Sequence, residues 1–103
     1  MNQIPRCCRS RKLPQDLVQT ARVNAVLSDG NRLRILCLLK NGELCVCEIW
    51  RLLSLAQNLV SHHLMMLKKA GLLHSRKDGL RVFYSINQPR LRRHIIKLKS
   101  LIK

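Results

Sequence analysis

A single β-hairpin is predicted in the second half of the sequence, in 73-LHSRKDGLRVFYSI-86. Asp78-Gly79 divides this segment into two stretches that favour β-strands. Asp-Gly between such stretches is the strongest short-range signal for a hairpin, because the turn needs residues that accept a positive φ. Elsewhere along the chain, apolar residues recur at helical spacing. The fold must therefore combine one hairpin with several helices.

Two helices are predicted in the first half of the chain. The first spans about residues 16–27, and Ser28-Asp29-Gly30 separates it from the next. The second spans about 31–40 and is apolar on most sides, so we expect it to lie in the core together with its Cys37. Asn41-Gly42 then provides a C-cap signal.

Further helices complete the pattern. A short one is expected at about 45–53 and a longer one at 57–70, whose inward stripe is Val60, Leu64 and Leu67. The last helix, 90–103, opens at Pro89 and has an apolar face made of Leu91, Ile95, Leu98 and Ile102. The order is helix, helix, short helix, turn, helix, hairpin, helix. This is the order of a winged helix-turn-helix, a mainly α fold with a small β-hairpin.

The chain is expected to form one domain preceded by an arm. Its 103 residues are enough for one domain but not for two. Residues 1–14 are basic, contain Pro5 and Pro14 and lack periodicity, so we interpret them as a flexible arm that carries Cys7 and Cys8. Residues 15–103 are then the winged helix-turn-helix domain.

The charge of the chain indicates a polyanionic partner. The sequence contains 20 Lys and Arg against 5 Asp and Glu, a formal net charge of +15 at pH 7. Nucleic acid is the simplest such partner. A membrane surface would favour aromatic anchors, and the sequence has one Trp, one Tyr and one Phe. Because no long apolar run or secretory signal is present, we expect a cytoplasmic protein without membrane contact.

Polar and basic residues gather where a winged helix-turn-helix meets DNA. The helix at 57–70 begins with small polar side chains, which in such a helix reach base edges. We predict base-edge contacts for Gln57, Asn58, Ser61 and His62. Basic residues suited to phosphates follow at the end of that helix and around the hairpin tip. They are Lys68, Lys69, Arg76, Lys77 and Arg81.

Several segments resemble the ArsR/SmtB family of metal-sensing repressors. They are 32-RLRIL-36, 43-ELCVCEI-49, 60-VSHHLMMLKKAGLL-73 and the Asp78-Gly79 turn followed by Tyr84. The resemblance covers about residues 16–98. It implies a homodimer in which the first and last helices pack together, with two recognition helices in successive major grooves of double-stranded operator DNA. It also implies repression that an inducer relieves.

The sequence departs from the family pattern at several positions. Ala56 stands where family members often have Ser or Thr, so we expect Ser54 to cap the following helix from further back or its first turn to fray. Trp50 replaces the third cysteine of the arsenic-type CVCxxC pattern. His94 stands alone on the last helix, which disfavours the family's zinc-type site there. The pattern makes His63 a partly buried packing residue.

Cys45-Val46-Cys47 is the strongest candidate for a sensing site. Positions i and i+2 of a helix point to different faces, so packing into one core does not explain why two cysteines have this spacing. At a helix start, free amides and the helix dipole favour thiolates, the form that binds soft metals. Small buried cysteines are the alternative. The place of the pair in ELCVCEI, which resembles the site of the family's thiolate-dependent sensors, favours metal ligands.

Two sulfurs are too few for a closed metal site. As(III) or Sb(III) needs three thiolates, and Cd(II), Pb(II) or Zn(II) takes three or four ligands. Cys7 and Cys8 are the expected supply, as the family's cadmium/lead and arsenic sensors imply; an exposed reactive pair is the alternative. In a reducing compartment we expect these cysteines to be thiols or metal ligands rather than disulfides.

The sequence therefore predicts a repressor that binds operator DNA when metal-free and is released by a thiophilic metal or metalloid ion. It requires no resident cofactor. The alternative is a DNA-binding regulator switched by thiol oxidation, with a disulfide between Cys45 and Cys47 or between a tail cysteine and either one. An enzyme is not expected, because the sequence shows no acid/base pair or Gly-rich phosphate loop.

Overall fold

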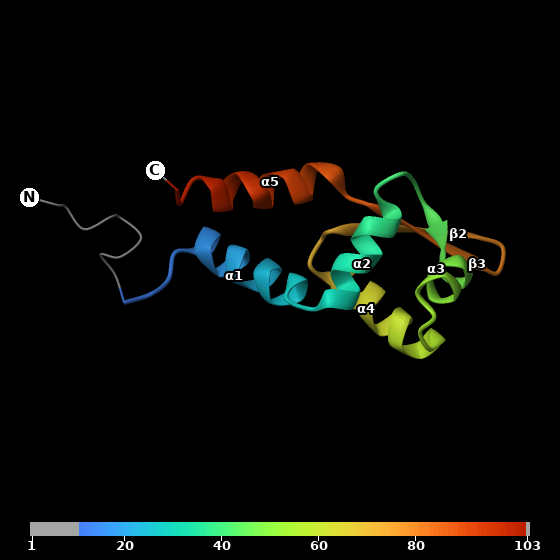
Figure 1. The fold of residues 1–103 in the computed structure, drawn as a ribbon. Coiled ribbons are helices and arrows are strands. Elements are labelled where there is room, and N and C mark those ends of the chain that lie inside the picture. Colours follow the sequence, from blue (N-terminus) through green and yellow to red (C-terminus); the bar gives the residue numbers. More distant parts are fainter. Residues whose placement is uncertain (1–10, 103) are drawn as a thin grey trace, which may run out of the picture.

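The computed structural model describes residues 11–102, which form a winged helix-turn-helix (Figure 1). The helices within this range are α1 (Gln15–Leu27), α2 (Gly30–Leu39), α3 (Val46–Leu53), α4 (Gln57–Lys69) and α5 (Gln88–Lys99). The strands are β1 (Leu44–Cys45), β2 (Leu73–Asp78) and β3 (Arg81–Ile86). The predicted fold class and order of elements are confirmed.

The wing is a three-stranded antiparallel sheet in the order β1-β3-β2. β2 and β3 form the predicted hairpin, in which Asp78 lies opposite Arg81, and Gly79 occupies its turn with a φ of 62°. β1 pairs with the other edge of β3, so that Cys45 lies opposite Phe83. Periodicity could not predict β1, because two residues are too few to show alternation.

The helix ends differ from the prediction in detail. Ser28 and Asp29 separate α1 from α2 as predicted, but Gly30 is already the first residue of α2, and the side chain of Asp29 caps that helix. Ser54 ends α3 in the left-handed region, at a φ of 54°, and the expectation that it caps α4 is wrong, since α4 follows Ala56 without a side-chain cap. Asn87 caps α5, which begins at Gln88 and ends at Lys99.

The core lies between α2, α3, α4 and the sheet. The predicted stripe of Val60, Leu64 and Leu67 is fully buried, which confirms how α4 faces the core. α2 buries Ile35 and Leu39, one turn apart on the same face. Cys37 is exposed, so its prediction as a core residue is wrong. Position 37 lies on the opposite side of α2 from the buried pair, and a helix that is apolar on most sides does not reveal which side packs.

α1 and α5 lie side by side at one end of the molecule, and the wing projects at the other (Figure 1). The Nζ atom of Lys97 and the Oδ2 atom of Asp16 form an ion pair at 2.5 Å between the two helices. Nε2 of His94, a buried residue of α5, lies 2.8 Å from Oδ1 of Asn24 in α1. These contacts hold the two helices of the predicted dimer interface together within one subunit.

Removing the α2 cap should destabilise the fold by about 1 kcal/mol. Asp29 Oδ1 accepts the N–H groups of Asn31 at 2.8 Å and of Arg32 at 3.3 Å, which otherwise have no partner within the helix. Asp29→Ala should therefore lower the free energy of unfolding in urea, measured at fixed protein concentration. Asp29→Asn keeps the accepting oxygen and should lose much less. Equal stability of wild type and Asp29→Ala would contradict the cap.

Candidate DNA-binding face and cysteine site

The first turns of α4 present the residues predicted to contact bases. Gln57, Asn58, Ser61 and His62 are all exposed, while the opposite side of the helix is buried in the core. α3 and the turn at 54–56 precede α4, which is the arrangement of a helix-turn-helix. These exposed side chains can reach a ligand outside the protein, and Oδ1 of Asn58 also accepts a hydrogen bond from the N–H of Leu59 at 2.9 Å. Their contact with base edges stays a prediction.

Of the five basic residues predicted to contact phosphates, Lys68 and Arg76 also bond to other residues of the protein. Lys69, Lys77 and Arg81 are exposed, the last two near the tip of the wing. Lys68 is exposed as well, and its Nζ atom donates a hydrogen bond to Oγ of Ser75 at 2.6 Å, which ties the end of α4 to β2. Their contact with phosphate stays a prediction.

Arg76 already has a partner in the protein. Its guanidinium forms an ion pair with both carboxylate oxygens of Glu43 and lies over the ring of Phe83, 4.5 Å from the ring centroid. The hydrogen bond from Arg76 lowers the pKa of Glu43, as expected for a carboxylate that accepts from a guanidinium. Arg76 thus joins β2 to the segment before β1, and a phosphate would have to compete with Glu43 for it.

A buried contact links α4 to the first two helices. His63 is 4% exposed, which confirms its prediction as a packing residue. Its Nδ1 atom accepts a hydrogen bond at 3.0 Å from Nε of Arg32, whose Nη1 atom donates to the carbonyl oxygen of Val26 at 3.2 Å. Because an arginine only donates, His63 must keep Nδ1 unprotonated here. Sequence reasoning missed this role of Arg32, although the residue belongs to the RLRIL segment.

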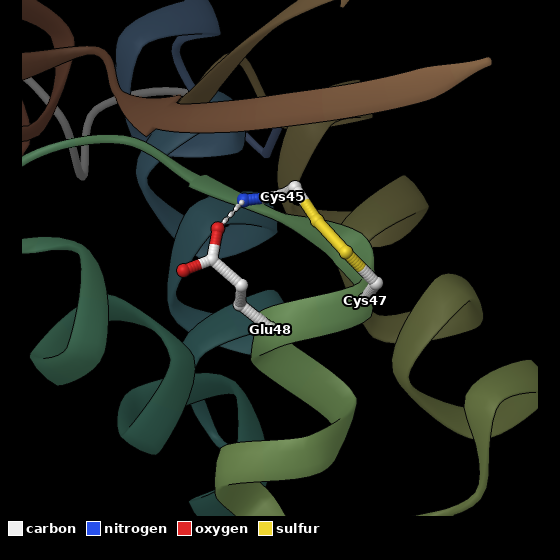
Figure 2. The surroundings of a disulfide bond; sticks show 3 residues. All are labelled: Cys45, Cys47 and Glu48. Carbon is white, nitrogen blue, oxygen red and sulfur yellow. Dashed lines mark hydrogen bonds between the residues drawn. A yellow bond between two sulfur atoms is a disulfide. The ribbon is translucent and has the colours of Figure 1, made fainter.

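Cys45 and Cys47 are joined by a disulfide at the start of α3 (Figure 2). Cys45 is the last residue of β1, and Cys47 lies in the first turn of α3; their Cα atoms are 5.3 Å apart. The backbone of Cys45 is extended and its N–H donates to Oε1 of Glu48 at 3.1 Å. Cys45 therefore lies just outside the helix, while Cys47 lies inside it. The expectation that the pair exists as thiols or metal ligands is wrong for this state of the molecule, because each sulfur is bonded to the other.

The disulfide opens into a hollow of about 360 Å³ that also contains predicted DNA contacts. Gln57 and Ser61 of α4 form one wall, and β3 contributes Arg81 and Tyr84 to another. The sulfur pair and the start of α4 therefore share one surface. Sequence reasoning could not find this hollow, because it forms only where α3, α4 and the wing meet.

The other predicted metal ligands, Cys7 and Cys8, lie outside the described residues. Within residues 11–102, no three His, Cys, Asp or Glu side chains come together in a way that could hold a metal ion. His94 contacts Asn24 instead. A metal site at Cys45 and Cys47 would therefore need reduction of the pair and ligands from elsewhere.

Burial of His94 should make the protein less stable in mild acid. Burial lowers the pKa of His94 below its ordinary value of 6.5. The unfolded chain then binds a proton first as the pH falls, so this contribution to stability is present above pH 6.5 and decreases below it. His94 lines a hollow between α1 and α5, and the charged residues that line it with His94 are Asp16, Arg90, Arg93 and Lys97.

The free energy of unfolding, measured between about pH 7.5 and 5, should fall less steeply in His94→Gln than in the wild type. His62→Gln, which changes an exposed histidine, is the matched control and should keep the wild-type slope. The same slope in wild type and His94→Gln would show that His94 does not make this contribution.

Fold and site together define the class of the protein. It is a winged helix-turn-helix domain, the architecture of DNA-binding transcriptional regulators, with paired cysteines beside α4. Residues 29–75 match the family described as "Bacterial regulatory protein, arsR family". The chain belongs to this family of transcriptional regulators, whose members are not enzymes. Within residues 11–102, no helix has the length and apolar character needed to cross a bilayer.

Similar proteins support the assignment over most of the chain. An uncharacterized HTH-type transcriptional regulator of Methanocaldococcus jannaschii is 44% identical over 81 residues, which are 78% of this chain and 90% of that protein. A cadmium resistance transcriptional regulatory protein of Staphylococcus aureus, a CadC homolog, is 34% identical over 84 residues, 81% of this chain and 69% of that protein.

A solved structure shows the same fold. It is the homodimeric winged helix-turn-helix DNA-binding domain of a possible ArsR-family transcriptional regulator from Mycobacterium bovis. It matches with a TM-score of 0.70 and 34% identity, and covers 82% of this chain and 80% of that chain.

Proposed function

We propose that this protein is a repressor that binds operator DNA as a homodimer and is released by a chemical change at Cys45 and Cys47. α4 and the wing make the DNA contacts, with Gln57, Asn58, Ser61 and His62 at base edges. The observation that carries the proposal is the shared hollow, in which the sulfur pair lies beside Gln57, Ser61 and Arg81. A chemical change at the sulfurs therefore acts directly on the proposed DNA-binding surface.

The dimer would form through α5 and the segments next to it. Apolar side chains there are at least 36% exposed in the single chain, a surface that a soluble protein rarely leaves in contact with water. They are Leu13, Ile95, Ile96, Leu98, Leu101 and Ile102. A second copy buries this surface and places two α4 helices for successive major grooves. The homodimeric domain from Mycobacterium bovis supports this arrangement.

The inducer of first choice is a thiophilic ion at the reduced pair. Thiolates at a helix start suit As(III), Sb(III), Cd(II), Pb(II) or Zn(II), with Cys7 and/or Cys8 as further ligands. The similarity to a cadmium resistance regulator supports an ion of this class. Drawing both sulfurs toward one ion would fix the start of α3. Ile49 and Leu53 of α3 belong to the same buried cluster as Val60 and Leu64 of α4, so the recognition helix would shift with it.

Thiol oxidation is the second candidate, and the disulfide favours it. Cys45 and Cys47 reach each other without help from the arm, so the pair can close by itself. Closing the disulfide fixes the same first turn of α3 that an ion would fix. The two signals therefore act on one structural element, and only their chemistry differs.

Metal binding by the reduced protein tests the first choice directly. The reduced wild type should bind Cd(II) with thiolate-to-metal absorption in the near ultraviolet, and Cys45→Ser/Cys47→Ser should lose it. Cys7→Ser/Cys8→Ser should bind more weakly because a closed site needs more than two sulfurs. Cys37→Ser, which changes an exposed cysteine of α2, is the control and should bind as the wild type does. Cd(II) binding that survives in Cys45→Ser/Cys47→Ser would contradict the site.

A further inference from the structure

The two sulfurs of the pair differ in their exposure to solvent. Cys45 is 2% exposed, because its strand pairs with β3 and its residue lies opposite Phe83. Its N–H is bonded to Glu48, which holds the residue against the start of α3. Cys47, in the first turn of α3, is half-buried. A reagent from solvent therefore meets the sulfur of Cys47 first.

The hollow beside Cys47 has a cationic wall. Its lining residues come from the start of α3, the start of α4 and β3 with the wing tip, and include the guanidinium-bearing Arg81. Gln57, Ser61 and Tyr84 add polar groups, and none of the lining residues is acidic. About 360 Å³ is room for a small molecule of drug size or less. The chemistry that fits is a small, negatively charged, sulfur-reactive compound.

We propose that Cys47 is a modification site for small disulfides that carry carboxylates, and that operator DNA covers this site. The second part rests on the proposed function, which places Gln57, Ser61 and Arg81 against DNA. Arg81 would attract the carboxylate in free protein and a phosphate in the complex. The adduct and the DNA therefore exclude one another.

The chemistry is a thiol–disulfide exchange in two steps. The Cys47 thiolate attacks one sulfur of a disulfide RSSR, so that the bond between Cys47 and RS forms, the RS–SR bond breaks, and RS⁻ leaves. The Cys45 thiol then loses its proton and attacks the Cys47 sulfur of this mixed disulfide, which releases the second RS⁻. The products are the Cys45–Cys47 disulfide and two RSH once the leaving thiolates are protonated. The protein loses two electrons and RSSR gains them.

We therefore expect operator DNA to protect the Cys47 sulfur from modification. Free repressor closes its disulfide through Cys47, while repressor bound to its operator keeps the sulfur covered. By linkage, any adduct that DNA excludes must weaken DNA binding by the same factor. An oxidising signal then acts first on the unbound pool and blocks its return to DNA.

The test uses full-length reduced protein with the arm cysteines replaced by serine, and glutathione disulfide as the probe. In Cys45→Ser the mixed disulfide cannot be resolved, so it should accumulate on Cys47 and be located by mass spectrometry of peptides. In Cys47→Ser, modification of Cys45 should be at least about tenfold slower, because that sulfur is buried. Similar rates at the two cysteines would overturn the assignment of Cys47 as the entry sulfur.

The charge preference and the effect of DNA are measured with the same Cys45→Ser protein. Arg81→Gln should slow modification by anionic glutathione disulfide but not by cationic cystamine; an equal effect on both would overturn the role of Arg81.

Adding a duplex from the region upstream of its own gene should slow modification of Cys47 by at least about tenfold, with Cys37 as the unprotected control. Fluorescence anisotropy of the same samples reports whether the complex forms. A formed complex without protection would overturn the inference, whereas absence of any complex would overturn the proposed function and leave the Cys47 and Arg81 results to decide the modification site.

Discussion

Operator binding should weaken by about 10³- to 10⁵-fold when monovalent salt rises from about 50 to about 200 mM. The chain carries a formal net charge of +15, and its predicted phosphate contacts occur twice in a dimer. Each phosphate that a cation neutralises releases counterions, so log K falls by about 0.9 per phosphate for each unit of log salt. A titration of fluorescent operator duplex at several salt concentrations measures this slope. A slope near zero would contradict a phosphate-dominated interface.

Single substitutions then identify the cations responsible. Lys77→Gln and Arg81→Gln remove exposed cations near the wing tip, so each should make the salt slope shallower by about 1 per phosphate lost and weaken binding to all sequences alike. Arg76→Gln is the matched comparison from the same wing. Arg76 is bound to Glu43, so its loss should change the slope much less. An Arg76→Gln slope change as large as that of Lys77→Gln would show that phosphate displaces Glu43.

Arg32→Ala should lower the free energy of unfolding by about 1–3 kcal/mol. The substitution leaves the buried Nδ1 of His63 and the carbonyl oxygen of Val26 without the donors that they have now. It also removes the hydrogen bond between α2 and the middle of α4, so operator affinity should fall as well. Chemical denaturation and anisotropy on the same preparation measure the two effects. Wild-type values of both would contradict the role of Arg32.

The matched control for Arg32 is Arg34 on the same helix. Arg34 donates to Asn31 and, at 3.4 Å, to the carbonyl oxygen of Leu53, and it is exposed. Arg34→Ala should therefore cost much less than Arg32→Ala. Arg32→Lys keeps the charge but lacks the planar guanidinium whose Nε and Nη1 atoms reach the two acceptors, so it should resemble Arg32→Ala more than the wild type. A double-mutant cycle with His63→Leu isolates the contact between Arg32 and His63.

Local patterns were sufficient to predict most of the fold. The Asp78-Gly79 turn, the stripe of Val60, Leu64 and Leu67, and the order of elements are set by neighbours within a few residues, and all are confirmed. Cys37 was misplaced because α2 is apolar on most sides, and the packing of α3 and α4 alone decides which side is buried. A cap from Ser54 was one of the two expectations for the start of α4, but Ser54 ends α3 instead, a difference that depends on the φ of one residue.

The candidate site was predictable in part. The place of Cys45 and Cys47 at the start of α3 follows from the sequence pattern. Their disulfide does not, because the oxidation state of a thiol pair depends on its surroundings and on the redox potential outside the protein. The hollow shared with Gln57 and Arg81 joins segments far apart in the sequence, and so does the contact of Arg32 with His63. No local spacing indicates either.

We expect the state of the Cys45–Cys47 pair to control operator binding. Fluorescence anisotropy tests this with a duplex from the region upstream of the protein's own gene, using reduced wild type and reduced Cys45→Ser/Cys47→Ser. Each protein is titrated with As(III), Cd(II), Pb(II) and Zn(II), and separately with glutathione disulfide after treatment with chelator. We expect both reduced proteins to bind the duplex, and at least one ion or the disulfide to release the wild type only. Release of both proteins by the same reagent, or of neither by any, would contradict the claim.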